Sequence, residues 1–305
     1  MRFSQSALVS GMRRTLEVRQ DPRLFGLVLE ALPPGPGGRN HLFAASSGRR
    51  SYVIKVRRDA NDTAEREAWA LRRLRGTLAP RLISWWPGNV AGEPSIQSPR
   101  CGGCLVMARV SGDVPSAVHL DLAARTVAEL HSSSPQRGPE LLCPSGYGSL
   151  LRYAADLGER VVRRKELSSS KLTTLTNAIR SLGSRNPPDF PSVRALCHGD
   201  LRWHNMRYVD HGLKLLDLEL AGLGDPAVDI ALMVARTPLS DSEATEFLSV
   251  YQAHRSDETL RARYAWVLPV VSLVSALSAV LGSGPGADEE LERALSRPKP
   301  GRDPR

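Results

Sequence analysis

A short apolar run that ends in a cluster of polar residues constrains this chain more than any other feature. Residues 195–205 read ALCHGDLRWHN and carry an acid and an amide, Asp200 and Asn205, five positions apart. Taken alone, such residues are typical of a polar turn. Whether they form a functional site depends on the charged residues that the rest of the sequence places on apolar elements.

Two charged residues upstream belong together. In residues 51–56, SYVIKV, strand alternation places Lys55 on one face, opposite an apolar face. In the helix expected next, Glu67 lies within a stripe of apolar residues at helical spacing. A carboxylate that faces the interior needs a cation, and Lys55 is the nearest preceding candidate. The sequence therefore predicts a Lys55–Glu67 ion pair.

A third charged residue of this kind lies downstream, in residues 213–220, LKLLDLEL. We expect a strand here, with Asp217 and Glu219 on one face and leucines on the other. Asp217 and the amide oxygen of Asn205 are hard oxygen ligands of the kind that Mg²⁺ takes when substrate phosphates and water complete its coordination. Asp200 is then free to accept a proton.

The formal charge of +9 suggests nucleic acid or a membrane surface as a partner, but its distribution argues otherwise. Residues 1–110 hold 18 Lys and Arg against 8 Asp and Glu, whereas residues 111–305 hold 23 against 24. The excess is scattered arginine with few aromatic residues between, unlike a nucleic-acid groove. We expect no nucleic-acid partner, and we expect the basic part to attract phosphates.

Four cysteines in 305 residues do not make a disulfide framework, which favours a cytoplasmic location. Cys101 and Cys104 have redox or half-zinc spacing without a second such pair, and we interpret them as flanking a Gly-Gly turn between strands. The N-terminal residues show no stretch long enough for a signal peptide. The most apolar segment, 264–281, contains Pro269 and several serines, and we expect a buried helix there rather than a membrane span.

Strand-like alternation comes first in the chain and helical spacing follows. The expected elements are strands between 28 and 56, a helix from about 62 to 74, further strands up to 110, and helices over 118–131, 150–183 and 229–281. We therefore expect an α+β chain with a small, mostly β N-terminal lobe over 1–110 and a larger, mostly helical lobe over 111–295. Residues 296–305 are expected to form a disordered tail.

The sequence resembles the aminoglycoside phosphotransferase and choline kinase branch of the protein-kinase-like fold. The matching pieces run in family order over about residues 25–235: GGRNHLF, VIK, REAWALRRL, LVMARVSG, AELHS, HGDLRWHN and LLDLELAGLGDPAVDIA. The pair HGD(x)4N and D(x)7DP(x)2D is highly specific. The resemblance implies a bilobal protein-kinase-like fold and Mg²⁺-dependent transfer of the γ-phosphoryl group of ATP or GTP to a hydroxyl of a small molecule.

The resemblance also implies roles for single residues. Lys55, held by Glu67, would contact the α- and β-phosphates. Asp200 would be the catalytic base or would position the acceptor hydroxyl, and Asn205 and Asp217 would bind Mg²⁺. The other implied residues are Gly37, Gly38 and Asn40 in the nucleotide loop, Met107 and Arg109 around the adenine, and His198, Asp225 and Asp229 as braces of the catalytic loop.

The acceptor stays open between an antibiotic, whose phosphorylation would give resistance, and a metabolite of the choline, homoserine or sugar type. The near-neutral C-terminal part is unlike the acid-rich sites of aminoglycoside enzymes. Trp203-His204 replaces the Pro-Gly pair often found before the asparagine, which would narrow the pocket or add a stacking surface.

Two rival functions are also considered. A protein kinase would carry HRD, DFG and APE signatures, which the sequence lacks, and the seven residues between Asp217 and Asp225 leave no room for an activation segment. A pseudokinase regulator would usually have lost the base or a metal ligand, yet Asp200, Asn205 and Asp217 are all present. The expected partners are a nucleoside triphosphate and a small-molecule acceptor, bound by a monomer or dimer without a membrane.

Overall fold

The chain separates into two compact units, of which unit 1 comprises residues Met1–Asp113 and Lys214–Glu219 and unit 2 comprises Val114–Leu213 and Leu220–Arg305. The segment Lys214–Glu219 was expected in the C-terminal lobe from its place in the sequence, but it groups with unit 1. The computed structural model describes residues 9–10, 26–33, 40–57, 63–87, 103–133, 137–141, 146–164, 169–183, 189–190, 193–237, 239–282, 291–292 and 294–295. The expected tail, 296–305, lies outside these residues.

Unit 1 is built on a five-stranded antiparallel sheet with the strand order β1-β2-β3-β5-β4. The strands expected between residues 28 and 56 are confirmed. The bounds are β1 Val28–Ala31, β2 Asn40–Ser47, β3 Arg50–Arg57, β4 Leu82–Trp86 and β5 Cys104–Ala108.

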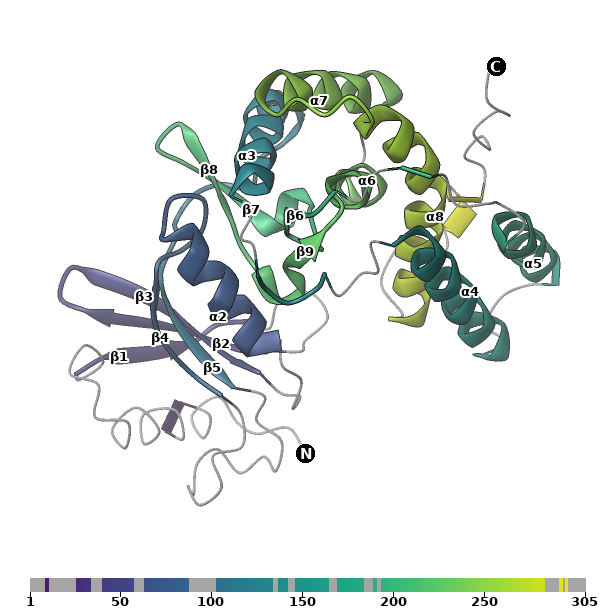
Figure 1. Cartoon of the computed structure of the whole chain (residues 1–305). Coiled ribbons are helices and arrows are strands. Elements are labelled where there is room, and N and C mark those ends of the chain that lie inside the picture. The colour runs from purple at the N-terminus through teal and green to yellow at the C-terminus, as the bar shows by residue number, and fades with distance from the viewer. Residues whose placement is uncertain are drawn as a thin grey trace. The chain divides into compact units, whose positions relative to one another are not determined.

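Alternation along β3 decides which face of this sheet forms the apolar core. Tyr52, Ile54 and Val56 point into a buried cluster that also contains Phe43, so the opposite face carries Lys55. Helix α2 (Thr63–Leu74) contacts β4 and β5 (Figure 1). The helix expected from about 62 to 74 is therefore confirmed, and it lies on the face of the sheet that carries Lys55.

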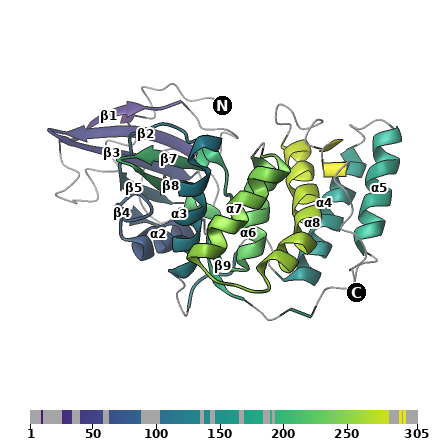
Figure 2. The same ribbon diagram turned by 90° about the horizontal axis from the view of Figure 1, so that it is seen from above.

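Unit 2 is mostly helical, as the sequence predicts. Helix α6 packs against α8, α3 against α7, and α4 against both α5 and α8 (Figure 2). The helical stretch expected over 150–183 is two helices, α4 and α5. The bounds are α3 Leu120–Ser132, α4 Tyr147–Arg164, α5 Ser169–Gly183, α6 Pro226–Arg236, α7 Asp241–His254 and α8 Leu260–Leu281. With the sheet of unit 1, these helices give the predicted α+β fold.

The prediction of a strand over residues 213–220 is wrong beyond Leu215. Strand β8 (Gly212–Leu215), which pairs with β7 (Met206–Val209), ends two residues before Asp217. Asp217 adopts a left-handed backbone with φ 60°, which aspartate tolerates better than most side chains and which ends the extended run. A short 3₁₀ turn, Leu218–Leu220, follows.

A short sheet in unit 2 joins the strand before the HGD motif to the segment before α6. Strand β6 (Ala195–Cys197) pairs antiparallel with β9 (Gly222–Gly224). Helix α6 begins directly after β9, with Asp225 as its N-cap accepting from the Ala227 N–H at 2.8 Å and Pro226 in the first helical position. The sheet therefore positions the segment that holds Asp200 and the start of α6.

Helix α8 is, among the described residues, the one helix that is long and apolar enough to cross a membrane by length and composition. Of its most apolar window, 61% is buried inside the structure, as in the core helix of a globular protein. Arg263, near its start, is fully buried and pairs with Asp225 and Asp257. The buried helix that the sequence predicts is thus what the structure shows.

Replacing Arg263 by Met should destabilise unit 2 strongly, because it leaves the buried carboxylate of Asp225 without this cation and Asp257 with Arg255 at 3.7 Å in its place. We expect Arg263→Met to lower the free energy of unfolding by about 3–5 kcal/mol, measured by chemical denaturation. The matched variant is Arg261→Met on the same helix, an exposed arginine whose one hydrogen-bond partner within the described residues is Ser249. It should change stability by less than about 0.5 kcal/mol. Equal losses would contradict the role of the Arg263 ion pairs.

Candidate active site

Unit 1 gathers three carboxylates around one lysine. The Nζ atom of Lys55 lies 2.8 Å from Glu67 Oε2 and 2.9 Å from Glu219 Oε2, and it also pairs with Asp217 Oδ1. The ion pair between Lys55 and Glu67 that the sequence predicts therefore forms. Both of its side chains are almost fully buried, whereas 36% of the Asp217 side chain is exposed.

The electrostatics of this cluster keep the lysine charged. Burial alone would lower the pKa of Lys55, but the charges of Glu67, Asp217 and Glu219 raise it above its ordinary value. Burial raises the pKa of Glu67, and the charge of Lys55 opposes that shift. The lysine is thus a fixed cation, which suits a contact with phosphate oxygens.

The cluster also fits a hard divalent cation. Oxygen atoms of Glu67, Asp217 and Glu219 lie within 4.8 Å of one another, and Mg²⁺ prefers such ligands. Lys55 pairs with all three carboxylates, and Arg57 pairs with Glu219. Asp217 is the most exposed of the three, so it is the carboxylate best placed to take a metal that arrives with a ligand.

The other predicted nucleotide-binding residues of unit 1 are only partly placed. Asn40, at the start of β2, donates from Nδ2 to Glu219 Oε2 at 3.3 Å, and its buried Oδ1 has no hydrogen-bond partner among the described residues. Gly37 and Gly38 lie outside the described residues. The Asn40 side chain therefore adjoins the carboxylate cluster, while the predicted role of the glycines stays a prediction.

The segment predicted to receive adenine is tied to the sheet. Met107 is buried in β5 and Arg109 is exposed beyond its end. The N–H of Ala108 donates to Arg81 O and that of Arg109 to Ser51 O, both at 2.9 Å. Neither donor is open to a base, so the role of Met107 and Arg109 in nucleotide binding stays a prediction.

Unit 2 holds the predicted base and amide in direct contact. Asn205 donates from Nδ2 to the backbone oxygen of Asp200 at 2.8 Å and to its Oδ2 at 2.9 Å. Both side chains are buried. Because the amide nitrogen is used in this way, the amide oxygen of Asn205 is left as an acceptor that could ligate a metal.

A glycine lets the chain turn between β6 and this pair. Gly199 has φ 82°, and a Cβ atom there would lie 2.7 Å from the backbone oxygen of Leu220. A side chain at this position would therefore be strained in its backbone and would clash with backbone. The HGD motif needs its glycine for this reason.

Asp229 braces the turn from α6. Its carboxylate accepts from the backbone N–H groups of His198 at 2.7 Å and Gly199 at 2.8 Å, and from His131 Nε2 at 3.0 Å. Burial would raise the pKa of Asp229, but the hydrogen bonds and the charges of the two histidines hold it below its ordinary value. The predicted bracing contact therefore exists.

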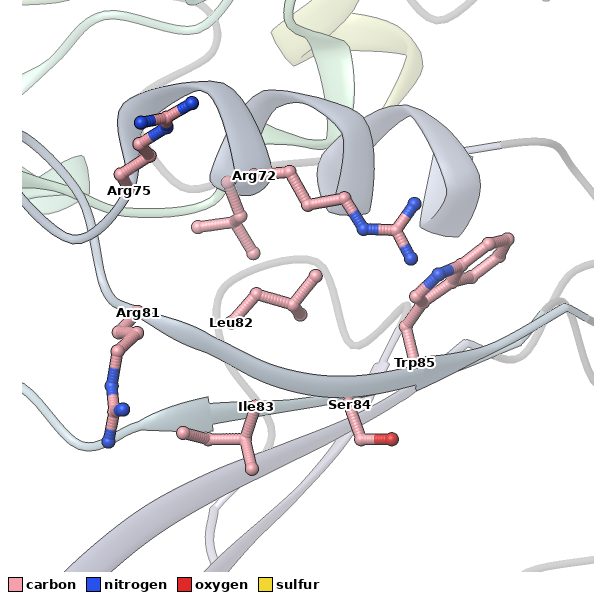
Figure 3. Close-up of a pocket in the computed structure, with 8 residues that line it drawn as sticks. Arg72, Arg75, Arg81, Leu82, Ile83, Ser84 and Trp85 are labelled. Carbon is pink, nitrogen blue, oxygen red and sulfur yellow. The ribbon is translucent and has the colours of Figure 1, made fainter.

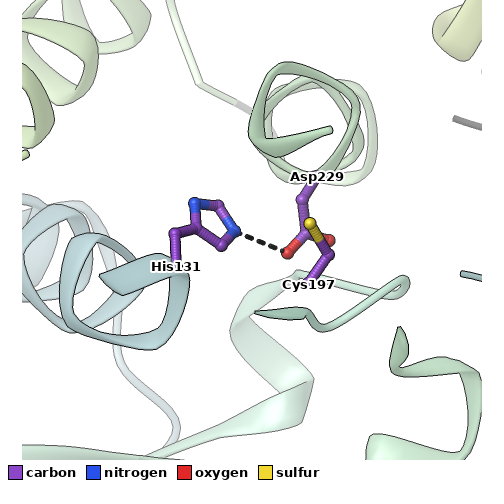
Figure 4. A group of neighbouring side chains, drawn as sticks. All are labelled: His131, Cys197 and Asp229. Carbon is purple, nitrogen blue, oxygen red and sulfur yellow. Dashed lines mark hydrogen bonds and ion pairs between the residues drawn. The ribbon is translucent and has the colours of Figure 1, made fainter. Parts of the chain in front are cut away.

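His131, Cys197 and Asp229 lie close enough together to suggest a metal site (Figure 4). The arrangement does not fit one. His131 uses its Nδ1 on the Tyr251 hydroxyl at 2.8 Å and its Nε2 on Asp229, and burial raises the pKa of the Cys197 thiol well above its ordinary value. Because both ring nitrogens of His131 already have partners and the thiol of Cys197 resists ionisation, the three residues form a structural brace.

Two arginines that sequence reasoning missed bind the carboxylate of Asp200. Arg202 Nη2 lies 2.9 Å from Asp200 Oδ2, and Arg236 Nη1 pairs with Oδ1. Arg202 was visible within the HGD motif, two residues after the aspartate. Arg236 lies at the end of α6, 36 residues away, and no local pattern marks it.

A separate cavity of about 530 Å³ lies in unit 1 between α2 and β4 (Figure 3). None of the predicted site residues lines it. Arg72 stacks on Trp85 at 5.3 Å, and Figure 3 shows Arg75 and Arg81 extending in opposite directions. Because the three guanidinium groups of its wall do not converge, this cavity is not a phosphate site.

Comparison with known proteins gives a family and a fold. The model of the phosphotransferase enzyme family matches residues 30–266. No curated protein matches the sequence.

Similar solved structures include a choline/ethanolamine kinase family protein from Mesorhizobium loti, 17% identical, with a TM-score of 0.64 over 94% of this chain and 95% of that one. An amicoumacin kinase solved with AMP-PNP, Ca²⁺ and Ami is 13% identical, with a TM-score of 0.63 over 96% of this chain and 98% of that one. A type I macrolide 2′-phosphotransferase is 17% identical, with a TM-score of 0.58 over 99% of this chain and all of that one. At identities of 13% and 17%, the similarity shows the fold alone. That fold is kinase-like, as the sequence predicts.

Removing the charge of Asp229 should unfold the turn that carries Asp200. In Asp229→Asn the amide group would face backbone N–H donors, so we expect a loss of about 3 kcal/mol or more in the free energy of unfolding. Asp121→Asn, at an exposed aspartate paired with Arg125 on α3, should cost less than about 1 kcal/mol. Thermal and urea denaturation of both variants measure the difference, and similar losses would argue against the brace.

Proposed function

The chain belongs to the phosphotransferase enzyme family, and we propose that it transfers the γ-phosphoryl group of Mg²⁺-bound ATP or GTP to a hydroxyl of an antibiotic or a related small molecule. The observation that carries this proposal is the buried Lys55–Glu67 ion pair beside Asp217. A lysine fixed as a cation next to an accessible carboxylate suits a nucleotide phosphate that brings its own metal. Phosphoryl transfer depends on this kind of positioning and charge neutralisation.

The residues of unit 2 supply the acceptor chemistry. We assign Asp200 the role of accepting the proton of the acceptor hydroxyl or orienting it, with Asn205 fixing the carboxylate through its 2.9 Å hydrogen bond. The amide oxygen of Asn205 and the carboxylate of Asp217 are the proposed metal ligands. When bound, Mg²⁺ would neutralise charge on the phosphates.

Two other functions remain as alternatives. A metabolite kinase is the second candidate, supported by the kinases of choline and ethanolamine among the similar structures. A nucleotide-binding pseudokinase would not need Asp200, Asn205 and Asp217 together, and all three are present. Profiling the growth of bacteria that express the chain against antibiotics of several classes separates resistance from a metabolic role.

Asp200→Asn should abolish transfer but spare nucleotide binding. Loss of a group that handles the hydroxyl proton should lower kcat by about 10²- to 10⁴-fold. The affinity for Mg²⁺-nucleotide, measured by titration calorimetry, should change less than about threefold, since the variant keeps the phosphate contacts. A variant with full transferase activity would overturn the assignment of Asp200.

Lys55→Met should instead weaken the use of nucleotide. The loss of charge-assisted bonds to phosphate should lower kcat/KM for the nucleotide by about 10- to 100-fold. Lys214→Met is the matched control, because among the described residues Lys214 donates to the backbone oxygens of Gly76 and Thr77 alone; its nucleotide kinetics should stay near wild type. Lys55→Met also leaves Glu67 buried without its cation, so the folded fraction of each variant is measured first by thermal denaturation.

A further inference from the structure

The carboxylate of Asp200 lies between two guanidinium groups of unit 2. Arg202 lies 2.9 Å from Oδ2, and Arg236 pairs with Oδ1. Within the described ranges of the chain, neither arginine forms an ion pair with a second carboxylate. The immediate surroundings of Asp200 therefore carry two positive charges against one negative charge.

Both guanidinium groups keep donors that the fold does not use. The Nε atom of Arg202 is buried and has no hydrogen-bond partner among the described residues. Arg236 is anchored on α8 by its Nε, which donates to Ser275 Oγ at 3.2 Å, while among the described residues its Nη2 has no acceptor. The buried Nε of Arg202 costs free energy where it stands, whereas Nη2 of Arg236 is not among the buried atoms and could donate to an acceptor that a ligand supplies.

These donors lie where a substrate must come. The acceptor hydroxyl has to reach hydrogen-bond distance of Asp200, so atoms two or three bonds from it lie beside Arg202 and Arg236. An ammonium group there would meet two like charges, whereas an oxyanion would receive charge-assisted hydrogen bonds from planar donors. The side chains of Arg202 and Arg236 are 35% and 20% exposed, which leaves them accessible to such a ligand.

We propose that the acceptor carries an oxyanion, a carboxylate or a phosphate ester, next to the hydroxyl that is phosphorylated, and that Arg202 and Arg236 bind it. This inference rests on the proposed kinase function. In the reaction the acceptor oxygen forms a bond to the γ-phosphorus, the bond from that phosphorus to the nucleoside diphosphate breaks, and the hydroxyl proton leaves through Asp200 to solvent. The two arginines select the acceptor and do not exchange protons.

The test compares acceptors that differ mainly in charge. Mg²⁺-ATP and the full chain are incubated with glycerate, glycerol 3-phosphate, glycerol and 2-amino-1,3-propanediol, and release of ADP and acceptor binding by calorimetry are measured. We expect the two anionic compounds to be used or bound at least about 10-fold better than glycerol, and the amine least well. Comparing glycerate with glycerol 3-phosphate shows whether a carboxylate or a phosphate ester is preferred.

Variants assign the preference to the arginines. Arg236→Met and Arg202→Met should each reduce the preference for anions by about 10- to 100-fold with little change in nucleotide KM. Arg236→Lys should keep part of the preference, which separates charge from a loss of folding. Arg125→Met, an exposed arginine on α3, is the matched control and should behave as wild type.

Distinct results overturn the two proposals. The inference is wrong if glycerol or the amine is used as well as the anions, if neither anion is used or bound, or if Arg236→Met and Arg202→Met keep the preference. The kinase function is wrong if the wild-type chain does not bind Mg²⁺-ATP, or if Asp200→Asn releases ADP as fast as wild type. Nucleotide binding without anion preference thus removes only the inference.

Discussion

A single buried carboxylate organises the part of unit 2 that holds Asp200. Asp229 belongs to α6, and it accepts hydrogen bonds from the two backbone groups just before Asp200 and from a histidine of α3. A carboxylate that is fully buried has to be satisfied by such donors. Here the donors are supplied by the very turn that presents Asp200, so satisfying the charge also fixes the turn. The sharp bend at Gly199 and the contact with Asn205 then follow from that anchor.

The two units carry clusters of opposite character. Three carboxylates gather around Lys55, and among the described residues Lys55 and Arg57 pair with them; a cluster so rich in carboxylates favours an additional cation. Around Asp200, within the part of the chain that the structure describes, two guanidinium groups face one carboxylate, and this arrangement favours an additional anion. The metal of a metal-bound nucleotide would supply the additional cation at the first cluster. An oxyanion on the acceptor would supply the additional anion at the second.

Sequence reasoning succeeded where the interaction partners are close along the chain. Lys55 and Glu67 are 12 residues apart, and the periodicities of one strand and one helix were enough to predict their contact. Alternation failed at Asp217, because a single left-handed residue ended the strand without a glycine to mark it. Residues 218–220, predicted to continue the strand, form a turn instead. Asp217 nevertheless pairs with Lys55.

The contacts that sequence could not predict are those whose partners meet only through tertiary packing. The resemblance implied Asp229 as a brace, but it did not identify the partner His131, 98 residues away, and it did not show that Arg236 reaches Asp200 from the far end of α6. Nothing in the residues next to Arg236 distinguishes it from an ordinary surface arginine. Because one fold hosts many acceptors, selectivity has to come from such side chains. The position of Arg236 depends on the packing of α6 against α8, through Ser275, so a change in that packing would alter acceptor choice and leave the HGD motif intact.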